Sequence, residues 1–328
     1  MLKRRPQFPE LSYANAGQPV LARWFIRSVE GLSGRDRFVA LYDFWRRNVV
    51  PSGDRVFGRM LDLIDVTVRG AEQWPPAGLP DTPLVIVANH PFGIGDGIAI
   101  LSLAERLGRP FRVMIHKDLL RVREMESYSL PVDFSETKEA LRNNMAVRHE
   151  AVRLLKEGVI IVVFPAGGVA TAPKGFGRAV DLPWKMFPAR LVQEAKASVI
   201  PMHFSGQNGR LFHLVSGPMN LAERDGRLAR LVGRTSLTLR TSLLIHEFAR
   251  LSGKSIDVRI GAPLDRAELE PLRDRKMLLE RLRRGVFDLA PAAPVQRLGR
   301  PPAGAPTGPP RLLPPPPPRR RAGPLGAP

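Results

Sequence analysis

Two side chains in the segment from Asn89 to Gly97 have the types and the spacing that proton transfer requires. His90 is followed by Asp96 within one glycine-rich stretch. A carboxylate that orients an imidazole fixes its tautomer and stabilises the imidazolium, so the histidine can act as a general base. The chain has no cysteine and no G-x-S-x-G elbow, so the base would activate a hydroxyl of the substrate. The alternative is a purely structural contact between the two side chains.

A second candidate site follows the most strongly predicted strand of the chain. Its small residues would let backbone N–H groups point at a phosphate or at a developing oxyanion. Lys174 and Arg178 follow closely and would add positive charge. The alternative is a tight turn at the strand exit. The predicted substrate-binding residues are Phe164, Pro165, Ala166, Gly167 and Gly168.

A third strand runs into the polar loop Ser205 to Asn208, which we expect to form another wall of the same cleft. His203 and His116 alternate with apolar neighbours, a pattern more typical of core histidines than of catalysts. A metal site made from these two and His90 would need a convergence that the spacing does not demand. We therefore predict no metal.

The elements that must position these residues alternate between strand and helix from residue 82 onward. Leu84 to Ala88 is a short, apolar, β-branched run, and it places His90 at the carboxyl end of a strand, where open α/β sheets hold their sites. Strands separated by helices of this length predict a layered α/β domain. The other predicted strands are 111–116, 130–134 (a short strand or a turn), 159–164, 198–204 and 255–260. The predicted helices are 98–107, 138–157, 183–197, 228–251 (one or two) and 269–289.

Three regions are predicted along the chain. Residues 1–75 form an N-terminal helical region, 76–290 the α/β domain, and 291–328 a disordered tail rich in proline and arginine. The N-terminal region contains the amphipathic segments Pro19 to Val29 and Arg35 to Asn48, whose aromatic stripes suit either a protein core or a bilayer surface. Phe57 to Ile64 continues in similar style, with a short strand at 65–69.

Composition limits the environment of the protein. The net charge is +19, which suits anionic lipid headgroups, nucleic acid or phosphorylated substrates, although a genome that prefers arginine gives the same excess. The absence of cysteine favours a reducing compartment. The N-terminus is not a secretory signal, and no stretch reaches the ~20 apolar residues of a spanning helix. We expect a soluble or peripheral protein.

Taken together, the segments resemble the sequence blocks of the glycerolipid acyltransferases of the lysophosphatidic acid type, in the same order, over about Asp81 to Leu264. The details are most similar to the bacterial branch labelled putative hemolysin or lysophospholipid acyltransferase, through Asp181-x-Pro183-Trp184 and Gly206-Gln207-Asn208. The blocks are Asn89-His90-Pro91 with Asp96-Gly97, Leu130 to Phe134, Phe164 to Gly167, and Val199-Ile200-Pro201.

This resemblance implies a mixed β-sheet flanked by helices and an O-acyltransferase similar to the 1-acylglycerol-3-phosphate enzymes. The reaction would move an acyl group from a thioester, on acyl carrier protein or coenzyme A, to a lysolipid hydroxyl. His90 maps to the family's general base and Asp96 to its orienting residue, and Phe164 to Gly168 map to the acceptor pocket. No metal or redox cofactor is implied. The expected partners are the lysolipid, the thioester and an anionic membrane surface, without specific nucleic acid, at the cytoplasmic face of the plasma membrane.

The chain departs from the family pattern in ways that bear on the acceptor. Five residues, Pro91 to Gly95, separate the histidine from the aspartate where four are usual, so the turn must bulge by one residue. The third block has Ala166 and Val169 where the family has Glu and Arg, and only Arg142 is a candidate for a second-block arginine. A zwitterionic or amino-acid lipid and lysophosphatidate both stay open as acceptors.

Two other functions are compatible with parts of the sequence. Gly93-x-Gly95 between a strand and a helix is superficially similar to a dinucleotide-binding turn, but the third glycine would fall at Ile98. The other alternative is a catalytically degenerate basic protein that binds membrane or nucleic acid. The altered third block favours degeneration, whereas the intact His90 and Asp96 favour an enzyme.

Overall fold

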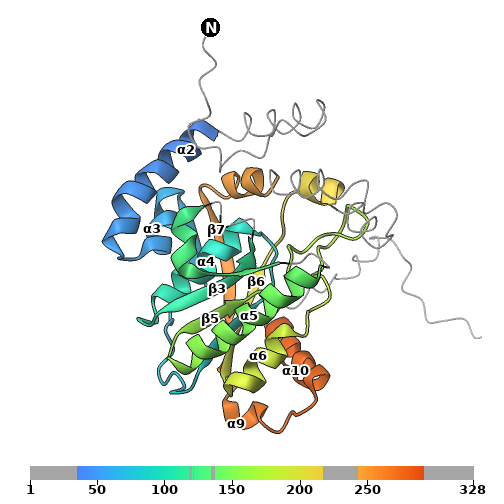
Figure 1. Cartoon of the computed structure of the whole chain (residues 1–328). Helices are drawn as coiled ribbons and strands as arrows, with labels where there is room; N and C mark the ends of the chain where they lie inside the picture. The colour runs from blue at the N-terminus through green and yellow to red at the C-terminus, as the bar shows by residue number, and fades with distance from the viewer. Residues whose placement is uncertain (1–34, 118–119, 121, 134–136, 217–242, 292–328) are drawn as a thin grey trace, which may run out of the picture. The chain divides into compact units, whose positions relative to one another are not determined.

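The computed structural model describes residues 35–117, 120, 122–133, 137–216 and 243–291. They form a mixed seven-stranded sheet with the order β1-β7-β6-β2-β5-β3-β4 (Figure 1), flanked by helices. The predicted α/β class is thereby confirmed. The strands are β1 Val66–Arg69, β2 Leu84–Ala88, β3 Phe111–His116, β4 Ser129–Val132, β5 Ile160–Val163, β6 Ser198–Ser205 and β7 Lys254–Ile260.

Five neighbouring strands of the sheet are parallel, and the two strands at one side, β7 and β1, run in the opposite direction. β6, β2, β5, β3 and β4 run in one direction, β7 pairs antiparallel with β6, and β1 pairs parallel with β7. Every residue of β2 and β5 is buried, as expected for continuous apolar, β-branched strands covered on both faces. Because β2, β5 and β6 are parallel neighbours, their carboxyl ends lie side by side at the same end of the sheet.

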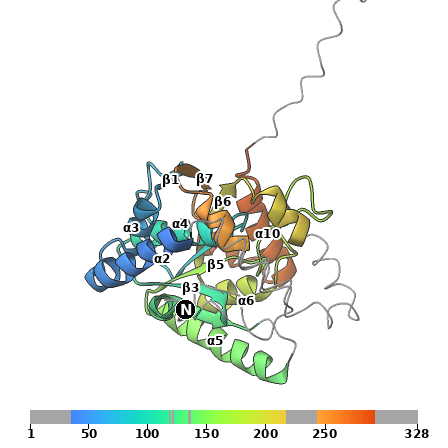
Figure 2. The same cartoon turned by 90° about the horizontal axis from the view of Figure 1, so that it is seen from above.

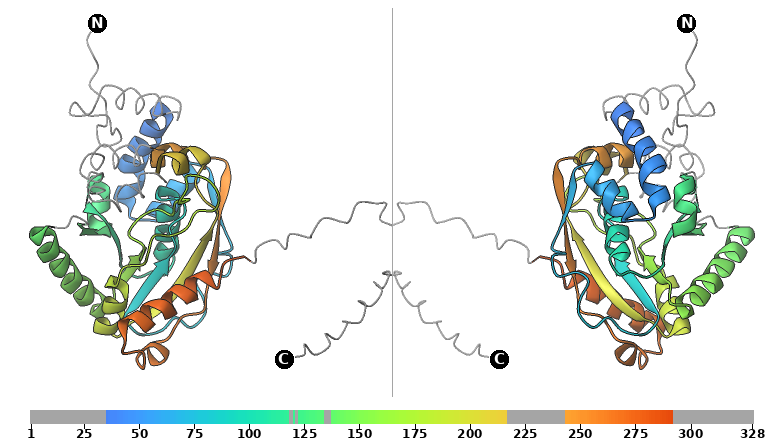
Figure 3. Two further views of the ribbon diagram at one scale, coloured as in Figure 1. Left: turned by 90° about the vertical axis from the view of Figure 1, so that its right-hand side faces the viewer. Right: turned by 90° about the vertical axis from the view of Figure 1, so that its left-hand side faces the viewer.

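Helices cover both faces of the sheet (Figure 2). One face carries α2 Arg35–Phe44, α3 Val56–Leu63 and α4 Ile94–Glu105, and the other carries α5 Lys138–Lys156, α6 Phe187–Ala195, α9 Arg266–Leu269 and α10 Arg275–Phe287. α10 packs across β6 and β2 (Figure 3). Leu84 and Ile86 join the first hydrophobic cluster, whereas Val85 and Val87 join the second, because successive side chains of a strand point to opposite faces.

The short helical segment η2 (Trp45–Val49) follows α2 and contributes to the core. Trp45 is 2% exposed and its indole N–H donates to the Val56 carbonyl at 2.7 Å. Tyr42 donates to Glu124 at 2.7 Å, a residue of η5 (Arg123–Tyr128). The aromatic stripe of the predicted helix Arg35 to Asn48 is therefore core from Tyr42 onward. Trp45, Val56 and Trp74 belong to the same cluster as β2, so residues on both sides of the predicted boundary at 75 share one core.

Several predicted helix boundaries need correction. α4 begins at Ile94 rather than at residue 98, so Gly95, Asp96 and Gly97 belong to its first turns. The helix predicted over 269–289 begins only at Arg275, where Asp274 caps α10 by accepting the Lys276 N–H at 2.7 Å, and the short helix α9 ends before it at Leu269. α6 begins at Phe187, four residues late, with a proline in its first turn.

Some predictions lie outside the described residues: the helix Pro19 to Val29, residues 228–242 of the predicted 228–251 helices, and the tail from 292 onward. Within the described ranges, no helix is both long enough and apolar enough to cross a bilayer.

Candidate active site

His90 and Asp96 meet at the carboxyl end of β2. The Nδ1 atom of His90 lies 2.8 Å from Oδ1 of Asp96, with the imidazole side chain 18% exposed and the carboxylate fully buried. The other carboxylate oxygen accepts the backbone N–H of Phe92 at 2.8 Å. One buried carboxylate thus orients the ring and also holds the turn that carries it.

Gly93 explains how a five-residue separation still brings the two side chains together. Its φ of 74° and ψ of −102° place it in a conformation that favours glycine, and α4 starts at the next residue. A Cβ at this position would lie 2.8 Å from the Leu244 side chain. The early helix start puts Asp96 on the first turn, where it faces back toward His90.

The imidazole is held from several directions. The ring stacks on Phe164 with centroids 4.0 Å apart and planes at 29°. The His90 carbonyl accepts the Ala170 N–H at 2.8 Å, and the His90 N–H donates to Oδ1 of Asp181 at 3.3 Å. No described residue forms a hydrogen bond with Nε2 of His90. The ring is therefore fixed through Nδ1 and its face, which leaves Nε2 for a substrate proton.

Two acidic groups govern the charge of this histidine. Burial alone would lower the pKa of His90, but the charge of Asp96, its hydrogen bond and the charge of Asp181 together raise the pKa above the ordinary value of 6.5. Burial raises the pKa of Asp181, although the hydrogen bonds from Trp184 and the His90 N–H oppose the rise. An imidazolium that forms during a reaction would be stabilised on both sides.

Asn89 ties the ends of β2 and β6 together. Its side-chain amide donates to the Phe204 carbonyl at 2.8 Å, and its side-chain carbonyl accepts the Phe204 N–H at 2.7 Å. Both hydrogen bonds are buried. Because Asn89 precedes His90, this pair of bonds fixes the backbone from which the imidazole projects.

Of the predicted residues of the third block, only Phe164 contacts the ring. Phe164 stacks on His90, while Pro165 and Ala166 are buried, Ala166 among the apolar side chains of the second cluster. The Gly167 N–H donates to the Phe164 carbonyl at 3.0 Å, which is the tight exit turn considered as the alternative. Gly168 follows, half-buried.

The other histidines and the cationic residues singled out in the sequence form no hydrogen bond or ion pair with His90 or Asp96. His203 is 6% exposed, its ring lies edge-on to Phe287, and burial followed by the charges of Arg178 and Arg259 lowers its pKa to about 4. His116 ends β3. In the described part of the chain no three metal-ligating side chains gather. Arg142, on α5, is exposed, and so are Lys174 and Arg178.

Asp181 and Asn89 were not selected as site residues from the sequence. The available signal for Asp181 was the Asp-x-Pro-Trp segment, whose tryptophan donates from its indole to Oδ2 of Asp181 at 3.1 Å. Asn89 carried a signal only through its position next to His90. Asp181 contacts His90 from 91 positions away, and Asn89 contacts Phe204 from 115 positions away, so only the fold reveals these two contacts.

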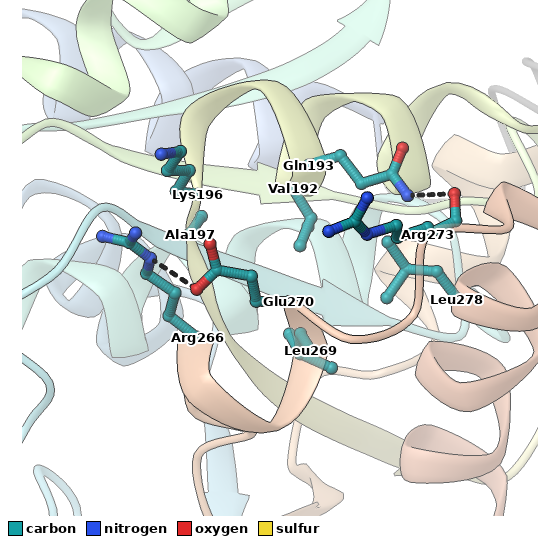
Figure 4. Close-up of a pocket in the computed structure, with 9 residues that line it drawn as sticks. All are labelled: Val192, Gln193, Lys196, Ala197, Arg266, Leu269, Glu270, Arg273 and Leu278. Carbon is teal, nitrogen blue, oxygen red and sulfur yellow. Dashed lines mark hydrogen bonds and ion pairs between the residues drawn. The ribbon is translucent and has the colours of Figure 1, made fainter.

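A separate pocket of about 280 Å³ lies away from the histidine (Figure 4). Its floor is apolar, and cationic side chains stand around it, one of which, Arg266, pairs with Glu270 at 3.6 Å. Lys196 and Ala197 precede β6, whereas Asn89 bonds to the far end of that strand. The pocket therefore belongs to the opposite edge of the sheet. Its lining residues are Val192, Gln193, Lys196, Ala197, Arg266, Leu269, Glu270, Arg273 and Leu278.

Residues 65–205 match the family model described as Acyltransferase. Two curated relatives are both named lyso-glycine lipid O-acyltransferase. The one from Bacteroides thetaiotaomicron is 29% identical over 157 residues, covering 45% of this chain and 51% of the relative. The one from Phocaeicola vulgatus is 24% identical over 153 residues, covering 45% and 50%.

The matched segment contains β2, the His90–Asp96 pair and the Phe164 turn, and it is similar to the glycerolipid acyltransferases. The resemblance found in the sequence is confirmed at that level. The chain spans about half the length of the curated relatives it matches.

Proposed function

We propose that the protein is a lipid O-acyltransferase that moves a fatty acyl group from a thioester to a hydroxyl of a lysolipid. His90 is the general base and Asp96 orients it. The observation that carries this proposal is the 2.8 Å contact between Nδ1 and the fully buried carboxylate, with Nε2 left unbonded by the described residues. The donor is acyl carrier protein or coenzyme A carrying the acyl chain.

In the proposed reaction, Nε2 of His90 takes the proton of the acceptor hydroxyl. The oxygen attacks the thioester carbonyl, the new C–O bond forms, and the C–S bond breaks when the tetrahedral intermediate collapses. The imidazolium returns its proton to the departing thiolate. Asp96 and Asp181 stabilise the positive ring meanwhile. No protein nucleophile, metal or redox cofactor takes part.

The side chains of the third block support an acceptor other than lysophosphatidate. Ala166 is 1% exposed and Val169 7% exposed, and each packs in an apolar cluster. In the family, an arginine usually stands where this chain has Val169, and a cationic side chain of that kind is what a phosphate would need. The printed names of both curated relatives specify a lyso-glycine lipid. We therefore propose a lyso amino-acid lipid as acceptor.

The proposed location is the cytoplasmic face of the plasma membrane, with the protein bound peripherally. The net charge of +19 supports attraction to anionic lipid headgroups. The partners are then the lysolipid, the acyl thioester and the anionic bilayer, and we propose no specific nucleic acid.

The test is consumption of acyl-carrier-protein and acyl-coenzyme A thioesters by the purified chain with a panel of lysolipids that includes a lyso-glycine lipid and lysophosphatidate. We expect turnover that is lost in His90→Ala and kept in His149→Ala, since His149 is exposed on α5. Thermal unfolding of both variants controls for folding. No turnover with any acceptor would favour the degenerate binding protein instead.

A further inference from the structure

An exposed apolar surface lies close to the candidate active site. It is formed by the loop 172–180 and the helical residues 210–216, which we call the docking rim. Isolated exposed apolar residues are ordinary, but a group of them marks an interaction site. The exposed members are Phe176 at 70%, Leu214 at 55%, Val180 at 50% and Leu211 at 39%.

The two segments of the docking rim are joined into one surface. A Cβ on Gly175 would lie 3.3 Å from Cα of Leu214, so the two backbones touch. The side chain of Gln207 accepts the Ala179 N–H at 2.8 Å and donates to the Gly177 carbonyl at 3.1 Å. The buried ring of His213 accepts the Ala172 N–H at 3.3 Å. The apolar side chains therefore share a supported surface.

The docking rim is basic as well as apolar. Lys174, Arg178 and Arg210 are exposed on it. Segments 172–180 and 205–216 contain no aspartate or glutamate. In the described part of the chain, no carboxylate forms an ion pair with these cations. Apolar side chains bordered by unpaired cations complement a bilayer that carries anionic headgroups.

The rim is connected to the backbone of His90. Residues 170 and 181 flank the loop, and both bond to the backbone of His90: the Ala170 N–H donates to its carbonyl, and its N–H donates to Asp181. Thr171 and Val180 pair across the base of the loop. A surface seated on the loop would therefore lie next to the proposed base. In Figure 1 the helical residues 210–216 (yellow) lie at the opposite end of the molecule from α9.

We propose that the docking rim seats this edge of the protein on an anionic bilayer, so that a lysolipid passes from the membrane to His90 without crossing water. The proposal deepens the proposed function and rests on it for the identity of the lipid delivered. Phe176 and Leu214 enter the headgroup region, and Lys174, Arg178 and Arg210 contact the anionic headgroups. The aromatic residues buried in η2 and α3 take no part.

Single-cysteine labelling tests the contact directly, because the chain has no cysteine of its own. An environment-sensitive fluorophore is attached at Phe176→Cys, at Leu214→Cys and, as a control, at Met277→Cys, which is 59% exposed on α10. With vesicles of phosphatidylglycerol and phosphatidylcholine, we expect a blue shift at the two rim positions and none at the control. Equal shifts at all three positions, or none at the rim, would overturn the proposal.

The energetic test uses Phe176→Asp combined with Leu214→Asp, with Met277→Asp as the matched control. We expect the rim variant to lose at least about ten-fold in vesicle partitioning, because buried apolar area drives interfacial binding. The control should bind like the unaltered chain. High salt should release the unaltered protein, since exposed charges are screened. Unchanged partitioning of the rim variant would contradict the proposal.

Two other occupants of the docking rim give different results. A fluorophore that is already shielded without lipid, at every protein concentration, would mean that the chain covers the rim itself. Shielding that grows with concentration would mean that a second copy does. Either result would overturn the bilayer proposal.

The proposed function is judged separately, with a short-chain acceptor that is monomeric in water. The rim variant should turn over this acceptor at the unaltered rate while losing turnover on vesicles. Vesicle binding through the rim without turnover of any acceptor would instead refute the enzyme and leave the membrane surface standing.

Discussion

The side chain of Asp96 contacts His90 through one carboxylate oxygen and the Phe92 N–H through the other, each at 2.8 Å. Since the group is fully buried, these neighbours compensate its charge in place of water. The same carboxylate therefore sets the orientation of the imidazole, its protonation and the shape of the turn between them.

Asp96→Asn should lower turnover about 10²- to 10⁴-fold, in line with loss of the orienting carboxylate in comparable sites. The charge of Asp96 raises the pKa of His90 against the lowering effect of burial. Without that charge the pKa falls, so the acidic limb of the pH–rate profile should move to lower pH. An acidic limb that stays in place would show that the titrating group is not His90.

Asp181→Asn should move the same limb in the same direction, but by less. Asp181 raises the pKa of His90 by its charge alone, whereas Asp96 adds a hydrogen bond to the ring. The pH–rate profiles of the two variants, measured side by side, give the comparison. A larger shift for Asp181→Asn would contradict the assignment of Asp96 as the orienting residue.

The His90–Asp96 pair should also appear in the pH dependence of stability. Because the pKa of His90 is raised in the folded state, the stabilisation is full below its ordinary value of 6.5 and is lost as pH rises through the raised value. The Tm of the unaltered chain should fall over this window relative to His90→Gln. His149→Gln, at an exposed position, should follow the unaltered chain.

Asn89→Ala should destabilise the fold by about 2–4 kcal/mol, because it leaves a buried donor and a buried acceptor of Phe204 without partners. Denaturant titration measures the free energy of unfolding. Asn143→Ala, at an exposed position on α5, is the matched control and should stay within about 0.5 kcal/mol of the unaltered chain. Equal effects of the two substitutions would mean that the β2–β6 link contributes little.

Gly93→Ala and Gly97→Ala should have opposite effects although the two glycines are near neighbours. Gly93 has a φ of 74° and its Cβ would meet Leu244 at 2.8 Å, so alanine there should cost at least about 1 kcal/mol and reduce activity. A Cβ on Gly97 meets nothing within 4 Å, and alanine in a helix should gain about 0.5–1 kcal/mol. Thermal unfolding and turnover together measure the contrast.

The α/β class, most of the strands and the choice of His90 and Asp96 as candidates for acid–base chemistry could be predicted from the residues alone. These features are local: β2 and β5 are continuous apolar runs, and α5 follows a clear period with Thr137 accepting the Ala140 N–H at its start. The strand β2 and the histidine that follows it can be recognised from neighbouring residues alone, without knowledge of any distant contact.

Tertiary structure alone decided which distant residues meet. Asp181 reaches the His90 backbone from ninety-one positions away, and Asn89 bonds to Phe204 across the sheet. The turn before α4, in which Gly93 has a φ of 74°, lies close to the side chain of Leu244, a neighbour that no local propensity specifies. The fold likewise decides which large apolar side chains are buried. Trp45 packs in the core, whereas Phe176 and Leu214 stay exposed.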